Sequence, residues 1–545
     1  MTSSTHFTAG NTPDAPRSDL PGLTEALAAD LRSIGYTVDG VAGFLGEAAH
    51  AALARDQLIP ALIATDAAAR RDPASAALAA VVRLWLLAEP QPAAALETAL
   101  PTVGSAGLTQ LGLVERGEGD LLQARVDLRP YGWDPVVDDD GQPSGGADLW
   151  VASDLAAHQS PGVLRHDHVL GIGQASTTLV QVTARRHAAR ALDLGTGCGI
   201  QTFHLLHHAE HVTATDISDR ALAFTRFNLV LNAAALHLDP ADLEARVSLR
   251  RGSLLEPVAG EEFDLVVSNP PFVITPRTAG ESSADQFTYR DGGLPGDDIV
   301  AALVRELPSV LTPGGTAQML GNWEIPAGAE WSVRPEGWAG GDVDVWFIQR
   351  ERVGPEQYAE TWLQDASEAR DRRLYRESYA AYLDDFAARN VAAIGFGMIW
   401  LRRPAAGARP VLRRFEEITY PIEQPVGPHL GAAVERADWL AGTDLASAHL
   451  LVADDVTEER HQRPGAEHPG VILLRQGAGL RRTNLLSTGL AGFVSACDGE
   501  LAVGQIIGAL DALLGGYEGY DSAAFRRGLL DDVGNLVRDG FLLPA

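Results

Sequence analysis

The sequence contains no lysine, only two cysteines and no long apolar run, and each absence narrows what the protein can be. All 43 basic residues are arginine, and against 72 acidic residues they leave a formal net charge of -29. Such an acidic surface repels a phosphate backbone, so nucleic-acid binding would need a local arginine patch. The two cysteines, Cys198 and Cys497, are too few for a disulfide framework. We therefore expect a reducing, cytoplasmic setting.

Membrane and secretory classes are also disfavoured. No uninterrupted apolar stretch approaches the roughly 20 residues that a membrane helix requires, and the N-terminus lacks the basic-then-apolar layout of a secretion signal. Hydrophobic content of 46% and charged content of 21% are ordinary for a folded globular chain. We therefore expect no membrane partner. With 545 residues, the chain should divide into about three or four domains.

The pattern along the chain predicts this division. Residues 1–20 are small and polar and indicate a flexible tail, and residues 21–135 have the helical spacing of an N-terminal domain whose end is typical of a winged helix. Residues 147–404 alternate strand-like and helix-like segments, which predicts an α/β domain with one Rossmann-like sheet and a helical insertion at about 355–391. Residues 405–545 are expected to form a C-terminal α+β domain that also ends like a winged helix.

A glycine-rich turn in "ALDLGTGCGIQTFHLL" is the first candidate site. Gly195, Gly197 and Gly199 follow a predicted strand and precede a predicted helix, so the backbone can turn tightly and approach a ligand at the helix N-terminus. A glycine triplet alone is equally compatible with an ordinary loop. About 20 residues later the next strand ends on Asp216, whose carboxylate can accept hydrogen bonds from two ribose hydroxyls. Together the two features predict a nucleotide-like ligand.

Residues 193–199, "DLGTGCG", resemble the first motif of the class I S-adenosylmethionine-dependent methyltransferases, D/E-x-G-x-G-x-G. The resemblance implies that Asp193 and the turn from Gly195 through Thr196 and Gly197 to Gly199 hold the methionine part of the cofactor. It implies that Asp216 and Ile217 lie at its ribose, and that Ser253 and Leu254 in "RGSLLEP" lie beside its adenine. The family usually has an acid where Ser253 stands, so a plain loop serine remains the alternative there.

The tetrapeptide at residues 269–272 in "FDLVVSNPPFVITP" closes a predicted buried strand. In the same family an [N/D/S]-P-P-[F/Y/W] sequence at this place marks methylation of a nitrogen bonded to a planar π-system. The Asn269 side-chain oxygen and the Pro270 carbonyl can accept hydrogen bonds from such a nitrogen, with Asn269 also next to the cofactor. Pro271 would rigidify the turn and Phe272 would cover the planar acceptor. A plain strand-terminating turn is the structural alternative.

Two further segments bear on the acceptor. "YRDGGLPGDD" at 289–298 resembles a segment of the release-factor glutamine methyltransferases, and Asp297 or Asp298 could cap the helix that follows. Arg165 and His168 lie in a stretch that these families place over cofactor and substrate, although a packing role is as plausible.

A helical row of histidines, His204, His208 and His211, has no matching fourth ligand, so we expect a solvated helix face and no metal.

The resemblance implies an N-methyltransferase that uses S-adenosylmethionine and modifies an RNA base amine or a protein glutamine amide. Large flanking domains favour such a macromolecular acceptor. Two alternatives stay open: a small-molecule N-methyltransferase, which an enclosed aromatic pocket over Phe272 would favour, and a non-catalytic cofactor-responsive protein that binds nucleic acid.

Overall fold

The computed structural model describes residues 7, 12–55, 57–134, 136–137, 143–144, 146–157, 159, 164–276, 293–365, 372–514 and 521–545. The chain divides into two compact units. The first comprises Met1–Leu179, His187–Val343 and Glu351–Ala406, and the second comprises Val180–Arg186, Asp344–Arg350 and Gly407–Ala545. The described helices include no segment with the length and apolarity that a bilayer crossing requires.

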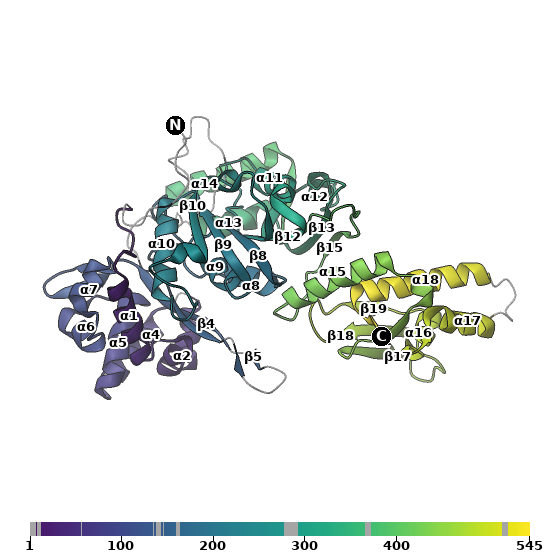
Figure 1. The fold of residues 1–545 in the computed structure, drawn as a ribbon, viewed down its shortest axis with the longest axis horizontal. Coiled ribbons are helices and arrows are strands. Elements are labelled where there is room, and N and C mark those ends of the chain that lie inside the picture. The colour runs from purple at the N-terminus through teal and green to yellow at the C-terminus, as the bar shows by residue number, and fades with distance from the viewer. Residues whose placement is uncertain are drawn as a thin grey trace. The chain divides into compact units, whose positions relative to one another are not determined.

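Short helices gather in the N-terminal part of the first unit (Figure 1). In chain order they are α1 (Pro21–Ser33), α2 (Val38–Leu45), α3 (Glu47–Leu53), α4 (Ile59–Ala68), α5 (Pro73–Trp85), α6 (Ala93–Ala99) and α7 (Gly104–Gln110). Helix α5 begins where Asp72 accepts a hydrogen bond from the Ser75 N–H and Pro73 occupies the first turn. Its apolar residues recur at helical spacing and are buried: Leu78, Val81, Val82 and Trp85.

A small antiparallel sheet follows these helices. Strands β1 (Gln91–Pro92), β2 (Val114–Arg116) and β3 (Leu121–Ala124) pair in the order β1-β3-β2. With α5, α6 and α7, this order of elements resembles a winged helix in which the β2–β3 hairpin is the wing. The turn of that hairpin carries Glu118 and Asp120, so the wing is acidic and poorly suited to a phosphate backbone.

The central element of the first unit is a mainly parallel sheet. Its strands are β8 (Ala188–Leu194), β9 (Ala209–Asp216), β10 (Val247–Arg251), β11 (Phe263–Ser268), β12 (Leu311–Pro326) and β14 (Val391–Arg402). They lie in the order β10-β9-β8-β11-β12-β14, parallel except for β14, which runs antiparallel to β12. Strand β11 is an almost continuous apolar run, as expected of a parallel strand buried on both faces.

Helices connect these strands in the alternating manner of an α/β fold. They are α9 (Ile200–Leu205), α10 (Asp219–Leu231), α11 (Asp298–Glu306) and α12 (Val333–Trp338). The chain passes from β8 outward to β9 and β10, then returns to place β11 and β12 on the other side of β8. This reversal leaves a crevice at the carboxyl ends of β8 and β11, the usual ligand site of such sheets.

Strands β4 (Asp127–Trp133) and β7 (Ala147–Ser153) form an antiparallel pair that packs against α10. Asn228 on α10 and Asn232, the residue directly after α10, supply the hydrogen bonds that a further strand would make at the free edge of β7. The Asn228 amide bonds both the N–H and the carbonyl of Ala152, and Asn232 does the same at Trp150. These contacts satisfy backbone groups that would otherwise be buried without partners.

Strands β5 (Val136–Val137) and β6 (Pro143–Ser144) pair with each other, and α8 (Gln174–Val182) precedes β8 in the chain.

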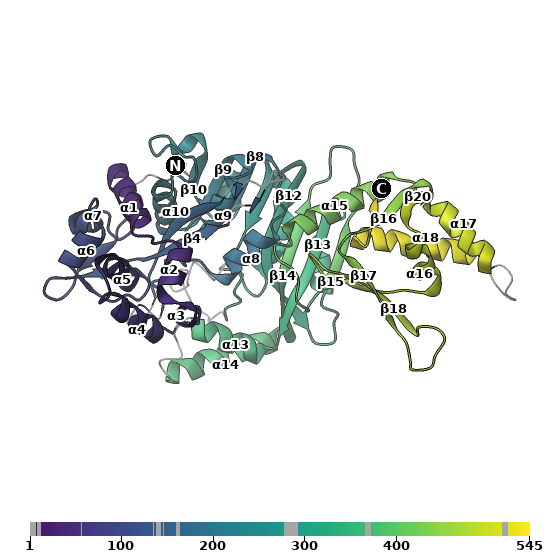
Figure 2. The ribbon, with the colours of Figure 1, turned by 90° about the horizontal axis from the view of Figure 1, so that it is seen from below.

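Helices α13 (Pro355–Asp365) and α14 (Arg372–Ala388) fall in the range of the helical insertion predicted from the sequence, and they lie side by side (Figure 2). Their shared core centres on Tyr358, which is buried and stacks on Phe396 of β14 with ring centroids 5.8 Å apart. The Tyr358 hydroxyl accepts hydrogen bonds from the Ile274 N–H at 2.8 Å and from Asn322 Nδ2 at 3.2 Å. The insertion thereby holds the chain segment that follows β11.

The second unit contains α15 (Gly427–Gly442) and two three-stranded sheets, together with β15 (Arg413–Glu417) and residues 344–350 of β13 (Asp344–Val353), which pair in parallel. In the first of these sheets β17 (Val456–His461), β18 (Val471–Gln476) and β19 (Thr483–Leu485) are antiparallel. Strands β16 (His449–Val452), β20 (Asp498–Ala502) and β21 (Leu542–Pro544) pair in the order β20-β16-β21.

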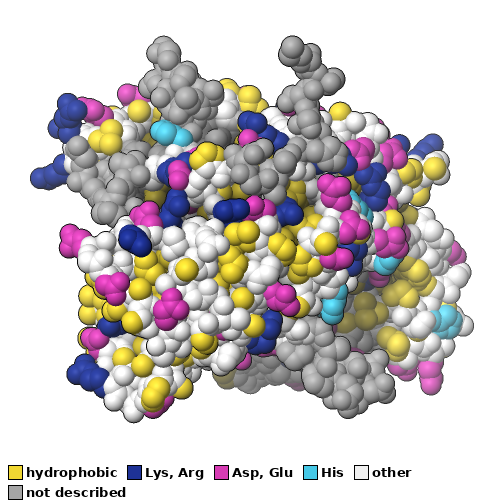
Figure 3. All heavy atoms as spheres, turned by 60° about the vertical axis from the view of Figure 1, so that its left-hand side comes forward, with side chains coloured by type: hydrophobic (Ala, Val, Ile, Leu, Met, Phe, Trp, Pro, Cys, Tyr) yellow, Lys and Arg dark blue, Asp and Glu magenta, His cyan; other side chains and the backbone are white. Residues whose placement is uncertain are grey.

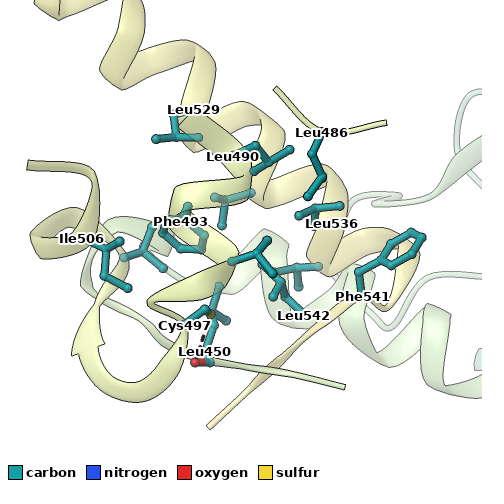
Figure 4. Packing of buried hydrophobic residues seen from close by; sticks show 14 of the residues in the cluster. Leu450, Leu486, Leu490, Phe493, Cys497, Ile506, Leu529, Leu536, Phe541 and Leu542 are labelled. Carbon is teal, nitrogen blue, oxygen red and sulfur yellow. Dashed lines mark hydrogen bonds between the residues drawn. The ribbon is translucent and has the colours of Figure 1, made fainter. Parts of the chain in front are cut away.

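Helices α16 (Thr488–Ser495), α17 (Val503–Leu514) and α18 (Ser522–Asp539) cover this last sheet with a hydrophobic core (Figure 4). Phe493, Leu536 and Phe541 are fully buried in it. Helix α18 ends at Gly540, whose φ of +84° lets the chain turn directly into β21.

We predict that Asn228→Ala lowers the free energy of unfolding by about 2–4 kcal/mol, because it leaves the N–H and carbonyl of Ala152 and the carbonyl of Cys198 without their partner. Thermal and denaturant unfolding followed by circular dichroism would measure the change. Asn535→Ala at an exposed position of α18 is the control. Equal stability of the two variants would contradict this account of β7.

Candidate functional site

A cavity of 1110 Å³ opens at the switch point of the first unit's sheet. Its wall combines the carboxyl ends of β8, β9 and β11 with Leu164, the stretch from His168 to Gly173 and the start of α10. Among the sequence-predicted residues, the following line it: His168, Gly195, Thr196, Gly197, Asp216, Ile217, Ser253, Leu254, Asn269, Pro270 and Pro271.

The glycine turn joins β8 to α9 with left-handed backbone at each glycine. Gly195, Gly197 and Gly199 have φ values of +78°, +58° and +94°, which other residues adopt only at a cost. A Cβ added at Gly197 would meet no atom within 4 Å. The open side of Gly197 faces space and not protein, so the backbone there is accessible to a ligand.

Asp193 lies beneath this turn. Its Oδ2 accepts hydrogen bonds from Thr196 Oγ1 at 2.7 Å, from the Thr202 N–H at 2.9 Å and from Thr202 Oγ1 at 2.6 Å. Burial raises the pKa of Asp193 to about 6, and its Oδ1 makes no hydrogen bond within the described chain. Asp193 is not among the residues that line the cavity. It shapes the turn, and its direct contact with a cofactor stays a prediction.

Asp216 ends β9 and lines the cavity. Its Oδ2 accepts a hydrogen bond from the Gly197 N–H at 3.0 Å, and its Oδ1 accepts one from the Ser218 N–H at 2.9 Å. Burial raises the pKa of Asp216. Each oxygen retains a lone pair for another donor, which fits a pair of hydroxyls. The neighbouring Ile217 is 52% exposed and presents an apolar side chain to the same cavity.

Ser253 and Leu254 line the cavity beyond the end of β10. Leu254 has a φ of +47°, a conformation that costs a residue with a Cβ about 1–2 kcal/mol. The loop is held by backbone contacts such as the Gly252 N–H to the carbonyl of Asp216 at 3.0 Å. The loop thus lies beside Asp216, and its contact with an adenine stays a prediction.

The tetrapeptide from Asn269 to Phe272 follows β11 at the cavity. Ser268 Oγ donates to the carbonyl of Leu194 at 2.8 Å, so the tetrapeptide is fixed against the glycine turn. Asn269 Oδ1 is buried and makes no hydrogen bond within the described chain. The Pro270 carbonyl accepts from the Phe272 N–H at 2.8 Å, which leaves it one lone pair. Phe272 is half-buried and does not line the cavity, so its contact with an acceptor remains a prediction.

The two residues predicted from the preceding stretch differ in position. His168 is buried and lines the cavity, with Nδ1 3.8 Å from Asp154 Oδ2. Arg165 lies outside the cavity wall, and its Nε donates to Asp167 Oδ1 at 2.8 Å on the surface. The structure therefore brings His168 and not Arg165 to the site.

Asp297 also has a role other than the expected one. It is the N-terminal cap residue of α11 by position, but its buried carboxylate makes no capping hydrogen bond. It instead binds the Arg334 guanidinium and the Glu324 N–H. The Asp297 carboxylate binds Arg334 in preference to the backbone N–H groups of α11, because a charged donor forms a stronger hydrogen bond than a neutral one.

The histidine row is also different from its predicted environment. His204 is 7% exposed, and its Nε2 lies 2.7 Å from the Tyr131 hydroxyl of β4. The expected solvated face is therefore wrong for His204, because β4 covers α9 there. The described residues contain no group of three or more side chains suited to a metal ion.

Sequence reasoning missed wall residues from outside the motifs. Asp127 and Arg129 of β4, Asp154 after β7 and Gln364 at the end of α13 all line the cavity. Asp154 is buried and pairs with Arg220 at the start of α10. The signal for Asp127 and Arg129 was a charged pair two residues apart in "VDLRPYG", but such alternation more often marks a solvent-facing strand surface.

Two family models match parts of the chain. Residues 154–287 match the methyltransferase small domain, and residues 33–125 match a domain of unknown function, DUF7059. The first match covers β8 to β11 with the glycine turn and Asn269. It confirms the class I methyltransferase core and the Rossmann-like fold predicted from the sequence, and the described structure confirms the helical N-terminal region.

Curated relatives share this central segment. The chain is 34% identical over 159 residues to the ribosomal protein uL3 glutamine methyltransferase of Bradyrhizobium diazoefficiens, covering 28% of this chain and 46% of the relative. It is 33% identical over 166 residues to the release factor glutamine methyltransferase of Geobacter sulfurreducens, covering 29% and 52%. The ribosomal RNA small subunit methyltransferase C of Alcanivorax borkumensis is 27% identical over 218 residues, covering 39% and 51%. The chain spans about half the length of these relatives.

Among solved structures, the T. thermophilus 16S rRNA N2 G1207 methyltransferase in complex with AdoMet and guanosine shares 17% identity, with 51% of this chain and 67% of that chain covered and a TM-score of 0.25.

We predict that Asp193 makes stability fall as the pH rises from about 4 to about 6. Because the folded-state pKa of about 6 exceeds the ordinary value of 3.8, the folded state binds more protons in this window and loses that advantage as the carboxyl ionises. The full effect is about 3 kcal/mol. Asp193→Asn should flatten the slope of the unfolding free energy against pH, measured by urea denaturation. Identical slopes in variant and wild type would show that burial does not shift this carboxyl.

Proposed function

We propose that this chain, which carries a methyltransferase small domain at residues 154–287, is an S-adenosylmethionine-dependent N-methyltransferase of a planar amine or amide nitrogen. The observation that carries the proposal is the unpartnered, buried Asn269 Oδ1 at the cavity that also contains Asp216 and the glycine turn. A buried acceptor without a donor is costly, so its presence there favours a ligand with an N–H group.

The residues present fit the cofactor. S-adenosylmethionine supplies, when bound, an electrophilic methyl group on a sulfonium. The remaining lone pairs of Asp216 suit its two ribose hydroxyls, and the open backbone at Gly197 suits a closely approaching chain. Ile217 and Leu254 offer apolar contact for the adenine, and Ser253 offers a hydroxyl.

Asn269 and Pro270 would orient the acceptor. The lone pair of an amide or exocyclic amine nitrogen is delocalised, so the nitrogen is a weak nucleophile. Hydrogen bonds from its N–H groups to Asn269 Oδ1 and to the free lone pair of the Pro270 carbonyl would hold the nitrogen in line and stabilise its developing positive charge. Pro271 stiffens the turn so that both acceptors are in place beforehand.

A macromolecular acceptor is favoured over a small molecule. The described residues that line the cavity include no Phe, Tyr or Trp, so they do not form the enclosed aromatic pocket that a small-molecule enzyme would favour. The relatives cited above are named for glutamine side chains of proteins or for ribosomal RNA.

Among macromolecules, charge favours protein. The net charge of -29 opposes binding to a nucleic-acid backbone, and the wing of the N-terminal domain carries Glu118 and Asp120. On the face seen in Figure 3, basic side chains of the described residues are interspersed with acidic ones. A glutamine amide in a protein therefore fits the described surface better than an RNA base amine.

Calorimetric titration with S-adenosylmethionine tests the cofactor site. The wild-type chain should bind, and Asp216→Ala should raise the Kd about 10- to 100-fold, since it removes two charge-assisted hydrogen bonds. Asp242→Ala, at an exposed position before β10, is the control and should leave the Kd unchanged. A wild-type chain that binds no cofactor would overturn the proposed function.

Asn269→Ala tests the chemistry. This variant should keep the wild-type Kd for S-adenosylmethionine and lose about 10²- to 10³-fold in turnover, the usual cost of one positioned group that stabilises developing charge. Methyl transfer from labelled cofactor would be followed in separate fractions of ribosomal RNA, ribosomal protein and release factor. Asn269→Asp retains an acceptor oxygen and serves as the matched variant. Full turnover in Asn269→Ala would refute the role of this side chain.

A further inference from the structure

Of the described residues of the helical insertion, one lines the cavity. Gln364, in the last turn of α13, belongs to the cavity wall and is exposed. Its side chain makes no hydrogen bond to another described residue. A carboxamide has two N–H donors and a carbonyl acceptor, so Gln364 offers both kinds of polar group to a ligand in the cavity.

Helix α13 is fixed to the chain segment that follows the Asn269 tetrapeptide. The hydroxyl of Tyr358 on α13 accepts a hydrogen bond from the Ile274 N–H at 2.8 Å. Leu363, directly before Gln364, is 2% exposed and belongs to the same hydrophobic cluster as Ile274 and Tyr358. The end of α13 that carries Gln364 therefore packs in one core with the segment that leaves Asn269.

The strand order places Gln364 on the side of Asn269 that lies away from the expected cofactor contacts. From β11, which ends before Asn269, strands β8, β9 and β10 lie in one direction and β12 and β14 in the other. Asp216 and Ser253 lie at the ends of β9 and β10, whereas α13 packs on β14 through the stacked ring of Tyr358. The cavity thus extends from a cofactor side at β9 and β10, past Asn269, to Gln364.

A planar amide needs a donor for its oxygen as well as acceptors for its N–H groups when it leaves water. Two other side-chain donors of the cavity wall are already used within the protein. Ser268 Oγ donates to the Leu194 carbonyl at 2.8 Å, and Gln201 Nε2 donates to the Ser176 carbonyl at 2.9 Å. The N–H groups of Gln364 are not used in this way, so they can serve the oxygen of a bound amide.

We propose that Gln364 binds the acceptor amide, with Nε2 donating to the amide oxygen while Asn269 and Pro270 accept from the amide nitrogen. This inference rests on the proposed function and deepens it, since it gives the helical insertion a part in recognising the acceptor. A hydrogen bond to the oxygen holds the amide before and during methyl transfer alike. Such a bond strengthens acceptor binding without speeding the transfer step.

Two cofactor analogues that differ in one group test this contact. In both, a nitrogen replaces the sulfonium sulfur; one carries a 2-acetamidoethyl group in place of the methyl, and the other carries an n-pentyl chain of the same length. For the full chain in calorimetry, Gln364→Ala should raise the Kd of the amide analogue about 3- to 10-fold and change that of the pentyl analogue less than about twofold. Gln357→Ala is the matched control, because Gln357 lies two turns earlier on the same face of α13 and does not line the cavity.

Gln364→Glu distinguishes the donor from the acceptor role of this side chain. It keeps the size and an oxygen but loses the N–H donors, so it should weaken binding of the amide analogue at least as much as Gln364→Ala. Wild-type affinity of Gln364→Glu for the amide analogue would overturn the assignment of Nε2 as the donor. Retained affinity for the pentyl analogue shows that a variant is folded.

The outcomes separate this inference from the proposed function. Equal changes for the two analogues in Gln364→Ala, or no change for either, would show that Gln364 does not bind an amide. A wild-type chain that binds S-adenosylmethionine but not the amide analogue would overturn the inference alone. If the wild type binds neither S-adenosylmethionine nor the analogues, the proposed function is wrong and the inference fails with it.

Turnover gives a second readout. With labelled cofactor and the protein fraction that accepts methyl groups, Gln364→Ala should raise the KM for the acceptor about 3- to 10-fold and keep kcat within about twofold, whereas Asn269→Ala lowers kcat. A loss confined to kcat in Gln364→Ala would contradict a role in binding. Methyl transfer to ribosomal RNA alone would overturn the amide as the acceptor and, with it, the assignment of Gln364.

Discussion

Parallel pairing of β8 with β11 is the constraint on which the site depends. The two strands are adjacent in the sheet although about 70 residues separate them, and their paired ends at Leu194 and Ser268 start the glycine turn and the Asn269 tetrapeptide. The Ser268 hydroxyl bonds the Leu194 carbonyl across this pair. A one-residue slip in the register would send the side chains of β11 to the opposite face. The register therefore fixes where an acceptor bound at Asn269 would meet a cofactor bound at the turn.

Polar side chains, and not the sheet alone, hold the elements around that pair. Asn228 supplies strand-like hydrogen bonds to β7 and also binds the turn at Cys198. Tyr358 performs a comparable task on the other side, where its hydroxyl binds the backbone N–H of Ile274 after the tetrapeptide. Both contacts are buried. Each gives the backbone groups a hydrogen-bond partner in place of the water that they lose on folding. The parts outside the matched segment thus support the site's geometry.

Because the sequence contains no lysine, arginine is its one side chain that is cationic at every ordinary pH. Buried or half-buried carboxylates pair with guanidinium groups at Asp154–Arg220, Asp297–Arg334 and Asp127–Arg129. The planar fork of arginine suits such pairs because it can bind both oxygens of a carboxylate with fixed geometry. Asp193 and Asp216 differ from them, since hydroxyls and backbone N–H groups supply their hydrogen bonds and burial raises the pKa of both. These two acids lie at the glycine turn.

The sequence by itself determined the local parts of this protein. Glycines after an apolar strand, an acid at the end of the next strand and Asn269 after β11 are short-range patterns, because each depends on the backbone of a few neighbouring residues. They identified the fold of the core, and most of the residues that they singled out line the cavity. Only the tertiary structure decided that Arg165 lies outside the cavity wall, that His204 is buried under β4, and that Asp127, Arg129 and Gln364 lie at the site. These positions depend on strand pairing and helix packing between distant segments, and no local pattern of polarity or spacing specifies such contacts.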